Sequence, residues 1–368
     1  MNLANFNQLT SWKCDSLLLL FHALTPRLLQ VEAALTRQTP CSLYVDHAER
    51  PRAAALRIGV CWYVAGNLTR QFLQGINEIL PRDIYSVLIL DPSITASERA
   101  LLCEGLYFVR AKSRYAKRTA SDTVQQPLPA GYDALPVNQH LLEGDLEGAS
   151  DLREGILHDW MSMEVYNRDG FGFAVAKDAK IVSHSLTDYV CGDRCEIGVF
   201  TDPAHRNKGL GAHVASLTAN EAFARGLNQV GWMSWANNAG SIAVSKRAGF
   251  IEECQYDIYI NHWPAGNPGD MTVTEFRAFA TDYERQFADH PPTESGYPHI
   301  VAATAWALAG ESASCRDSIH RAIDLGWLKT LDQLRELWPE LLRSSKILEN
   351  EEWRAVFSRL RQEEDGCP

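Results

Sequence analysis

The chain has 368 residues, of which 46% are hydrophobic and 22% are charged, a composition typical of a soluble globular protein. This length allows two or three domains, each with its own core. The formal net charge of −11 excludes a general nucleic-acid binder, because such proteins need a broadly basic surface. Any anion site must therefore be local.

The nine cysteines include no CxxC pair, which favours a reducing compartment over a disulfide framework or a structural zinc. The apolar run 17–21 is too short for a signal core. No apolar run approaches the ~20 residues that a membrane span needs. We therefore expect a cytoplasmic protein that does not insert into a membrane and holds no metal.

The first predicted domain, residues 1–125, alternates helical and strand-like segments, which is typical of an α/β unit. Helices are predicted at 16–35 and 69–80. Strands are predicted at 56–66 and 86–91. The basic segment 110–131 lacks apolar periodicity, so we interpret it as a loop or linker.

The second predicted domain, residues 126–262, has the clearest pattern and is predicted to be mixed α+β. Its expected helices are at 151–170, 210–227 and 237–250, and its expected strands are at 171–178, 180–190, 195–201, 229–236 and 254–260. The Pro/Gly-rich stretch 263–270 then reads as a hinge.

The third predicted domain, residues 270–368, contains only helical patterns. They lie at 272–289, 297–310, 314–326, 329–337 and 350–364. The segment 303–327 resembles a tetratricopeptide-type helical hairpin, which implies a repeat-like domain that binds a protein partner. Alternatively, this helical tail only stabilises a homodimer.

The stretch 203-PAHRNKGLG-211 lies between the predicted strand 195–201 and the helix that follows. Backbone N–H groups in the first turn of a helix lack intrahelical partners, and the helix dipole adds partial positive charge there. Glycines allow a phosphate to approach the backbone, and the basic side chains add charge. The spacing matches neither a Walker A motif nor GxGxxG, so a plain basic turn is the alternative.

The run R-N-K-G-L-G resembles the R/Q-x-x-G-x-G/A motif of the GCN5-related N-acetyltransferases (GNAT family). Asn238 with 241-SIAVSKRAGF-250 is similar to the second half of that signature. The run 159–211 also resembles the branch typified by the zwittermicin A resistance acetyltransferase. The resemblance implies an α+β fold, with a splayed mixed sheet flanked by helices and preceded by a divergent α/β half.

The resemblance also implies acetyl-coenzyme A as the acetyl donor and assigns its contacts. The pantetheine arm would lie along the exposed strand at Val199, Phe200 and Thr201. The second signature element, with Asn238 and Ser241, would flank the thioester. The pyrophosphate would bind the amides of Arg206, Asn207, Lys208, Gly209, Leu210 and Gly211.

Glu196 lies on the strand that carries the family's usual general base, and a carboxylate there could accept the proton of an amine. The alternative is an edge-strand glutamate paired with Arg194 or Lys208. Glu164 is the second acid of interest, although a solvated helix-face glutamate would look the same.

The helix that carries Glu164 also carries Trp160 and Tyr166, which the resemblance places at the acceptor. One position departs from the family pattern: Ser245 stands where a tyrosine often protonates the leaving thiolate. Tyr256 and Tyr259 are then the candidates for that acid, with a core role as the alternative.

The sequence thus predicts an N-acetyltransferase that acts on the amine of a small molecule, for example an antibiotic or another natural product. Two alternatives stay open. One is a non-catalytic sensor that binds acyl-coenzyme A, and the other is a protein acetyltransferase that recruits targets through its helical tail.

Overall fold

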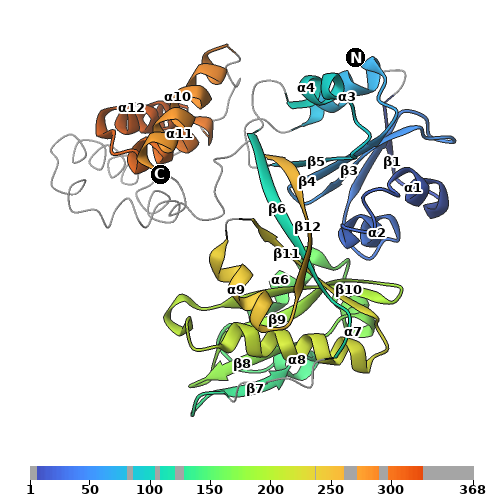
Figure 1. Cartoon of the computed structure of the whole chain (residues 1–368), viewed down its shortest axis with the longest axis vertical. Coiled ribbons are helices and arrows are strands. Elements are labelled where there is room, and N and C mark those ends of the chain that lie inside the picture. The colour runs from blue at the N-terminus through green and yellow to red at the C-terminus, as the bar shows by residue number, and fades with distance from the viewer. Residues whose placement is uncertain are drawn as a thin grey trace, which may run out of the picture. The chain divides into compact units, whose positions relative to one another are not determined.

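The computed structural model describes residues 6–80, 86–103, 108–120, 128–236, 238–260, 272–289 and 297–325 (Figure 1). The chain divides into two compact units. The first comprises residues 1–78, 88–102 and 111–258, and the second comprises residues 79–87, 103–110 and 259–368. Each unit is considered by itself, and the predicted division at 1–125, 126–262 and 270–368 stays a prediction.

A sheet of twelve strands runs in the order β1-β2-β3-β4-β5-β12-β6-β11-β10-β9-β8-β7. The last strand in sequence, β12, lies between β5 and β6, so the N-terminal strands and the later ones form one sheet. The strands are β1 (Asn7–Leu9), β2 (Ser42–Val45), β3 (Ala53–Ile58), β4 (Cys61–Gly66), β5 (Val87–Leu90), β6 (Phe108–Lys117), β7 (Asp133–Pro136), β8 (Gly172–Lys177), β9 (Lys180–Cys191), β10 (Arg194–Thr201), β11 (Gln229–Trp235) and β12 (Ile251–Ile260).

The α-helices of the described residues are α1 (Cys14–Leu20), α2 (Leu29–Leu35), α3 (Arg70–Ile79), α4 (Ala96–Cys103), α5 (Gln139–Leu142), α6 (Ala149–Asp159), α7 (Met163–Asp169), α8 (Leu210–Ala224), α9 (Ala239–Arg247), α10 (Val273–Asp289), α11 (Tyr297–Leu308) and α12 (Ser312–Asp324). A short 3₁₀ turn at Pro203–His205 precedes α8.

Three segments predicted as single elements are divided in the structure. The helix expected at 16–35 is α1 and α2 with turns between them, and Pro26 lies in the interruption. The strand expected at 56–66 is the hairpin of β3 and β4, which reverses at Gly59 with φ +53°. The helix expected at 151–170 stops at Asp159, and Ser162 caps a new helix by accepting the Val165 N–H.

The interpretation of 110–131 as a linker is wrong for residues 110–117, which belong to β6 and pair antiparallel with β11. The basic residues hid the strand because two of them are buried with distant partners. The Arg114 guanidinium donates to Glu253 at 3.2 Å, and Lys117 Nζ donates to the Ala248 carbonyl at 2.9 Å. Hydrogen bonds and an ion pair offset the cost of burying these charges.

The strands β8, β9 and β10 carry a core on each face. Alternate residues face opposite sides, so Ile181 packs with α6 residues while Val182 packs with α8 residues. Figure 1 shows α8 crossing one face of these strands. The result is a mixed α/β arrangement with helices packed on both faces of these strands.

In the second unit, α10 packs on α11 and α11 packs on α12. Small side chains line these contacts, including Ala302, Ala303 and Cys315, all of which are buried. The helices expected at 329–337 and 350–364, and the hinge at 263–270, lie outside the described residues. The tetratricopeptide likeness therefore stays a prediction. In the described part of the chain, no helix has the length and apolarity that a bilayer span requires.

Candidate active site

The strand β10 loses one of its two neighbours halfway along its length. It pairs with β9 from Arg194 to Thr201, but its parallel pairing with β11 ends at Glu196 and Gly231. Beyond that point β11 continues to Trp235, paired with β6. From Ile197 onward, the β11-facing edge of β10 is therefore an open sheet edge, which can pair with an extended ligand. This is the splay that the family resemblance implies.

A bulge lies at the same place. Glu196 is opposite Tyr189 and Ile197 is opposite Thr187, so Asp188 is an extra residue on β9 with no partner in the ladder. Bulges often redirect a side chain beside an active site. Here the Asp188 carboxylate accepts the Gly198 N–H, and a Cβ on Gly198 would stand 2.7 Å from Asp188 Oδ1. Any larger residue at position 198 would therefore force the Asp188 carboxylate to move.

The turn between β10 and α8 presents a row of unpaired amides. Asn207 and Gly209 have φ of +63° and +80°, a left-handed backbone that helps successive N–H groups converge. In the described residues, the N–H groups from 207 to 212 have no protein partner, and the first bond of the helix is His213 N–H to the Gly209 carbonyl. With exposed Arg206 and Lys208 beside them, these amides suit a phosphate group.

Gly211 serves a different purpose from the one expected. A Cβ there would lie 3.2 Å from Thr201 Oγ1 and 3.5 Å from Val199 Cγ1, against the strand and not toward an approaching anion. Gly211 therefore lets α8 pack closely on β10, and Gly209 is the glycine that the turn conformation requires.

Of the three residues predicted to hold the pantetheine arm, Val199 and Thr201 lie on the strand face that carries α8, and Phe200 lies on the opposite face. The Thr201 hydroxyl lies 2.8 Å from Ser183 Oγ, on the side of Gly211. Val199 packs at the core beside α8. Phe200 is 49% exposed and stacks on His184 with ring centroids 5.5 Å apart. Only backbone atoms of this strand could serve all three predicted contacts.

The predicted thioester-flanking residues have structural bonds of their own. Asn238 caps α9 by accepting the Ser241 N–H at 3.0 Å, and Ser241 Oγ accepts the Trp232 indole N–H at 3.0 Å. Ser245 is fully buried and donates to the Ile242 carbonyl at 3.0 Å. The Ser245 hydroxyl is thus engaged inside the helix and is no substitute for the missing tyrosine.

Glu196 is the most unusual side chain of the site. It is 2% exposed, and neither carboxyl oxygen has a hydrogen-bond partner among the described residues. Burial raises the pKa of Glu196 to about 7, although the positive charges of Arg114, Lys112 and Arg194 oppose the shift. Arg194 forms its close ion pair with Glu32, so the pairing of Glu196 with Arg194 considered above does not occur.

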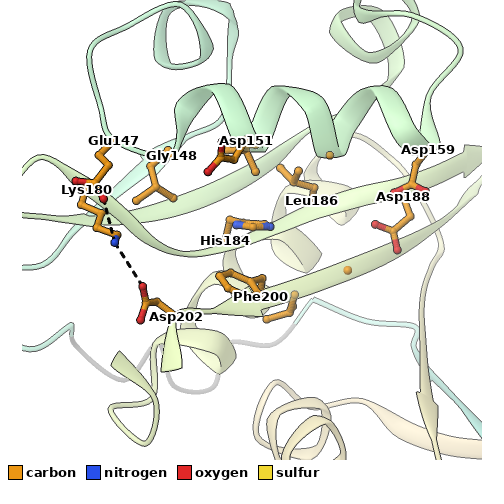
Figure 2. Close-up of a pocket in the computed structure, with 15 residues that line it drawn as sticks. Glu147, Gly148, Asp151, Asp159, Lys180, His184, Leu186, Asp188, Phe200 and Asp202 are labelled. Atoms are coloured by element: carbon orange, nitrogen blue, oxygen red, sulfur yellow. Dashed lines mark ion pairs between the residues drawn. The ribbon is translucent and has the colours of Figure 1, made fainter. Parts of the chain in front are cut away.

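A cleft of about 550 Å³ opens between α6 on one side and β9 and β10 on the other (Figure 2). Sequence reasoning missed the acidic character of this cleft, because its carboxylates come from separate elements. The Asp188 pKa is raised well above its usual value by burial of the carboxyl group and by the nearby Asp159 and Glu196. Burial also raises the Asp159 pKa. Asp188 carried no local signal beyond its place in a strand.

Trp160 and Tyr166 lie behind the cleft and do not line it. Each is 1% exposed, and their rings pack edge to face in the core of α6, α7 and β9. The Trp160 indole donates to the Thr187 carbonyl at 2.9 Å, which fixes the chain beside the bulge. Glu164 is exposed on α7, as in the solvated alternative. Among the described residues, no cluster of potential metal ligands is found.

Comparison with known proteins places this geometry in a family. The family model described as GNAT acetyltransferase matches residues 30–259, which is more than half of the chain. The chain is 26% identical over 150 residues to the protein named "Uncharacterized N-acetyltransferase YdfB" of Bacillus subtilis (strain 168). That match covers 41% of this chain and 55% of the relative, so the chain spans about half the length of the curated relative that it matches.

Solved structures share the fold. A GCN5-related N-acetyltransferase-like protein from Streptococcus suis 89/1591 superposes with a TM-score of 0.52 at 17% identity, covering 67% of this chain and 97% of its own. At that identity the likeness concerns the fold alone. With a family match across residues 30–259, the chain belongs to the GNAT acetyltransferase family.

Proposed function

We propose that the protein transfers the acetyl group of acetyl-coenzyme A to an amine of a small molecule. The observation that carries the proposal is the placement of Glu196, a buried carboxyl group with a pKa of about 7, at the residue where β10 and β11 diverge. An open strand edge follows it, and a turn of unpaired amides lies at the end of that edge.

The residues of β10 and the following turn fit the donor. The unpaired amides from 207 to 212, with Arg206 and Lys208, would hold the pyrophosphate, and the open edge of Ile197–Thr201 would pair with the pantetheine arm. Acetyl-coenzyme A supplies an activated thioester: the new N–C bond forms as the C–S bond breaks. No contact from the Asn238 or Ser241 side chain is needed.

Glu196 is suited to accept the proton of the amine. A base works best with a pKa near the working pH, and at pH 7 about half of a group with this pKa is ionised. An attacking amine must be neutral, so proton transfer to a Glu196 oxygen prepares it. Because neither oxygen has a hydrogen-bond partner among the described residues, either can receive that proton.

Tyr256 is the better of the two candidates for protonating the leaving thiolate. It lies in the same unit as Glu196, whereas Tyr259 belongs to the other unit. The Tyr256 hydroxyl donates to Met233 Sδ at 3.0 Å, and Met233 lies on β11, across the divergence from β10. Burial and the charge of Glu196 raise the Tyr256 pKa, so the phenol stays protonated at neutral pH and can donate a hydrogen bond to the leaving sulfur.

The test is release of coenzyme A, followed with a thiol-reactive dye, across a panel of small amines, with acetyl-coenzyme A binding measured separately by calorimetry. Turnover with at least one amine, lost in Glu196→Gln while cofactor binding is kept, is the expected result. Tight cofactor binding with no turnover on any amine would overturn the proposal in favour of an acyl-coenzyme A sensor. The helical tail is proposed to bind a protein partner or to form a homodimer, and its removal should then leave turnover intact.

A further inference from the structure

The cleft beside β10 has a wall built from one helix. On α6, Asp151, Gly155 and Asp159 follow one another at intervals of four residues, so they form a stripe along the helix, and all three line the cleft. Figure 2 shows Asp159 close to Asp188 at one end of the cleft, Asp151 farther along the helix, and Lys180 with Glu147 at the other end. At 1.5 Å per residue, the two helix positions are about 12 Å apart along the axis.

Gly155 lies between these two acids on α6 and has no side chain to project into the cleft. A glycine inside a helix costs roughly 1 kcal/mol relative to alanine, so its presence there needs a reason. No atom would lie within 4 Å of a Cβ at this position, so packing does not require the glycine. Its missing side chain instead leaves space along the cleft, whose lining also includes the apolar side chains of Leu186 and Phe200.

The cleft carries an excess of negative charge with one cationic side chain among its described residues. Lys180 lies at the outer end, where it pairs with Glu147 at 3.0 Å and Asp202 at 3.7 Å. His184 adds no positive charge near neutral pH, because burial lowers its pKa to about 4. Among the described residues, neither Asp159 nor Asp188 forms an ion pair with a lysine or an arginine, and His158 Nδ1 lies 3.1 Å from Asp159 Oδ1.

Two further observations concern the inner end of the cleft. Asp188 is the extra residue of the bulge, and a glycine at position 198 makes room for its carboxylate. Glu196 is 2% exposed, has no hydrogen-bond partner among the described residues and does not itself line the cleft, but its charge acts on Asp188 and raises the pKa of that carboxyl group. An ammonium group placed there would relieve that repulsion, and a carboxylate would increase it.

We propose that this cleft binds an acceptor with two positively charged groups joined by an apolar chain, that is, a linear diamine or polyamine. The reacting amine lies at the inner end by Asp159 and Asp188, beside Glu196, and the second ammonium lies about 12 Å away by Asp151. The inner amine loses a proton and gains the acetyl group, while the outer ammonium is unchanged. The acetylation of the inner amine rests on the proposed function, whereas the binding of the two ammonium groups does not.

The experiment compares three matched probes of equal length on the full chain: a 1,ω-diaminoalkane, a 1-aminoalkane, and an ω-amino acid whose carboxylate replaces the second ammonium. Chain length is varied, and both binding by calorimetry and coenzyme A release are measured. We expect the diamine to bind at least tenfold more tightly than the monoamine, with the amino acid weakest. The diamine advantage should shrink as salt is raised.

Variants on α6 locate the second ammonium. Asp151→Asn should remove most of the diamine advantage while leaving monoamine binding unchanged. Glu154→Gln, an exposed acid on the same helix that does not line the cleft, is the matched control and should change neither. Gly155→Leu should weaken binding of both probes by filling the cleft, with an unchanged or raised melting temperature because leucine favours the helix.

The outcomes separate this inference from the proposed function. If monoamines and diamines are acetylated with equal efficiency, or amino acids are acetylated best, the dication site is wrong and the acetyltransferase proposal stands. If diamines bind with the expected dependence on Asp151 but no amine is acetylated, the proposed function is wrong and the site stands. Equal binding of all three probes refutes the inference whatever the turnover.

Discussion

Replacing Glu196 by glutamine should stabilise the protein at neutral and alkaline pH, although it removes the proposed base. Glutamine keeps the shape of the side chain and cannot ionise. Because burial raises the Glu196 pKa from 4.5 to about 7, the folded state prefers the protonated form. The contribution of that preference is complete below pH 4.5, and it is lost as the pH rises toward 7.

The size of the effect follows from the two pKa values. Each pH unit between them is worth about 1.4 kcal/mol, which gives about 3 kcal/mol in total. The free energy of unfolding of Glu196→Gln, minus that of the wild type, should therefore grow by about 3 kcal/mol between pH 4 and pH 8 and then level off. Since the chain has two compact units, hydrogen exchange of the β10 amides reports on the relevant unit better than global melting does.

The control is Glu164→Gln, which makes the same chemical change on an exposed face of α7 and should show no such growth with pH. Turnover should respond in the opposite sense to stability: Glu196→Gln should lower kcat by about 10²-fold or more. It should also abolish the rise of the wild-type rate through pH 7. If the stability difference is flat or falls with pH, Arg114 and Lys112 hold Glu196 ionised, and the argument for a base poised near neutrality is refuted.

Two other predictions concern the donor site. Gly209→Asp should weaken acetyl-coenzyme A binding more than tenfold in calorimetry. Gly209→Asn should weaken it far less, because asparagine tolerates the same left-handed backbone and carries no charge. Equal losses would mean that the substitutions affect the backbone and not the anion site. Tyr256→Phe should lower kcat with little change in cofactor affinity, while Ser245→Ala should leave kcat unchanged; the reverse pattern would reassign the acid.

The parts of this site that were predictable from sequence are local. The turn at 206–211 combines basic residues, glycines and a helix start within a few positions, so its conformation and its unpaired amides follow from short-range rules. The strand that carries Glu196 was also predicted, because the segment 195–201 leads directly into this turn. The order of strands and helices in 171–260 also followed from periodicity, because each face of these strands is buried by a different helix.

The parts that were missed depend on distant residues. The strand β6 looked like a linker because Arg114 and Lys117 are basic, yet Arg114 donates to the Arg27 carbonyl and to Glu253, which are 87 and 139 residues away. Sequence spacing gives no measure of such partners. The meeting of Asp159 with Asp188 likewise requires α6 to lie on β9, and the pKa of Glu196 depends on how completely it is buried.

The bulge at Asp188 explains why these separate features occur at one place. An extra residue in β9 interrupts the ladder with β10 at Glu196, the same residue after which β10 leaves β11. Beside this interruption the Asp188 carboxylate accepts the Gly198 N–H, and Glu196 is buried with no hydrogen-bond partner among the described residues. In a regular ladder, residue 188 would have a partner on β10, and its side chain would not be directed to the cleft in the same way. The bulge therefore lies where the open strand edge begins, next to Glu196 and to the acidic end of the cleft.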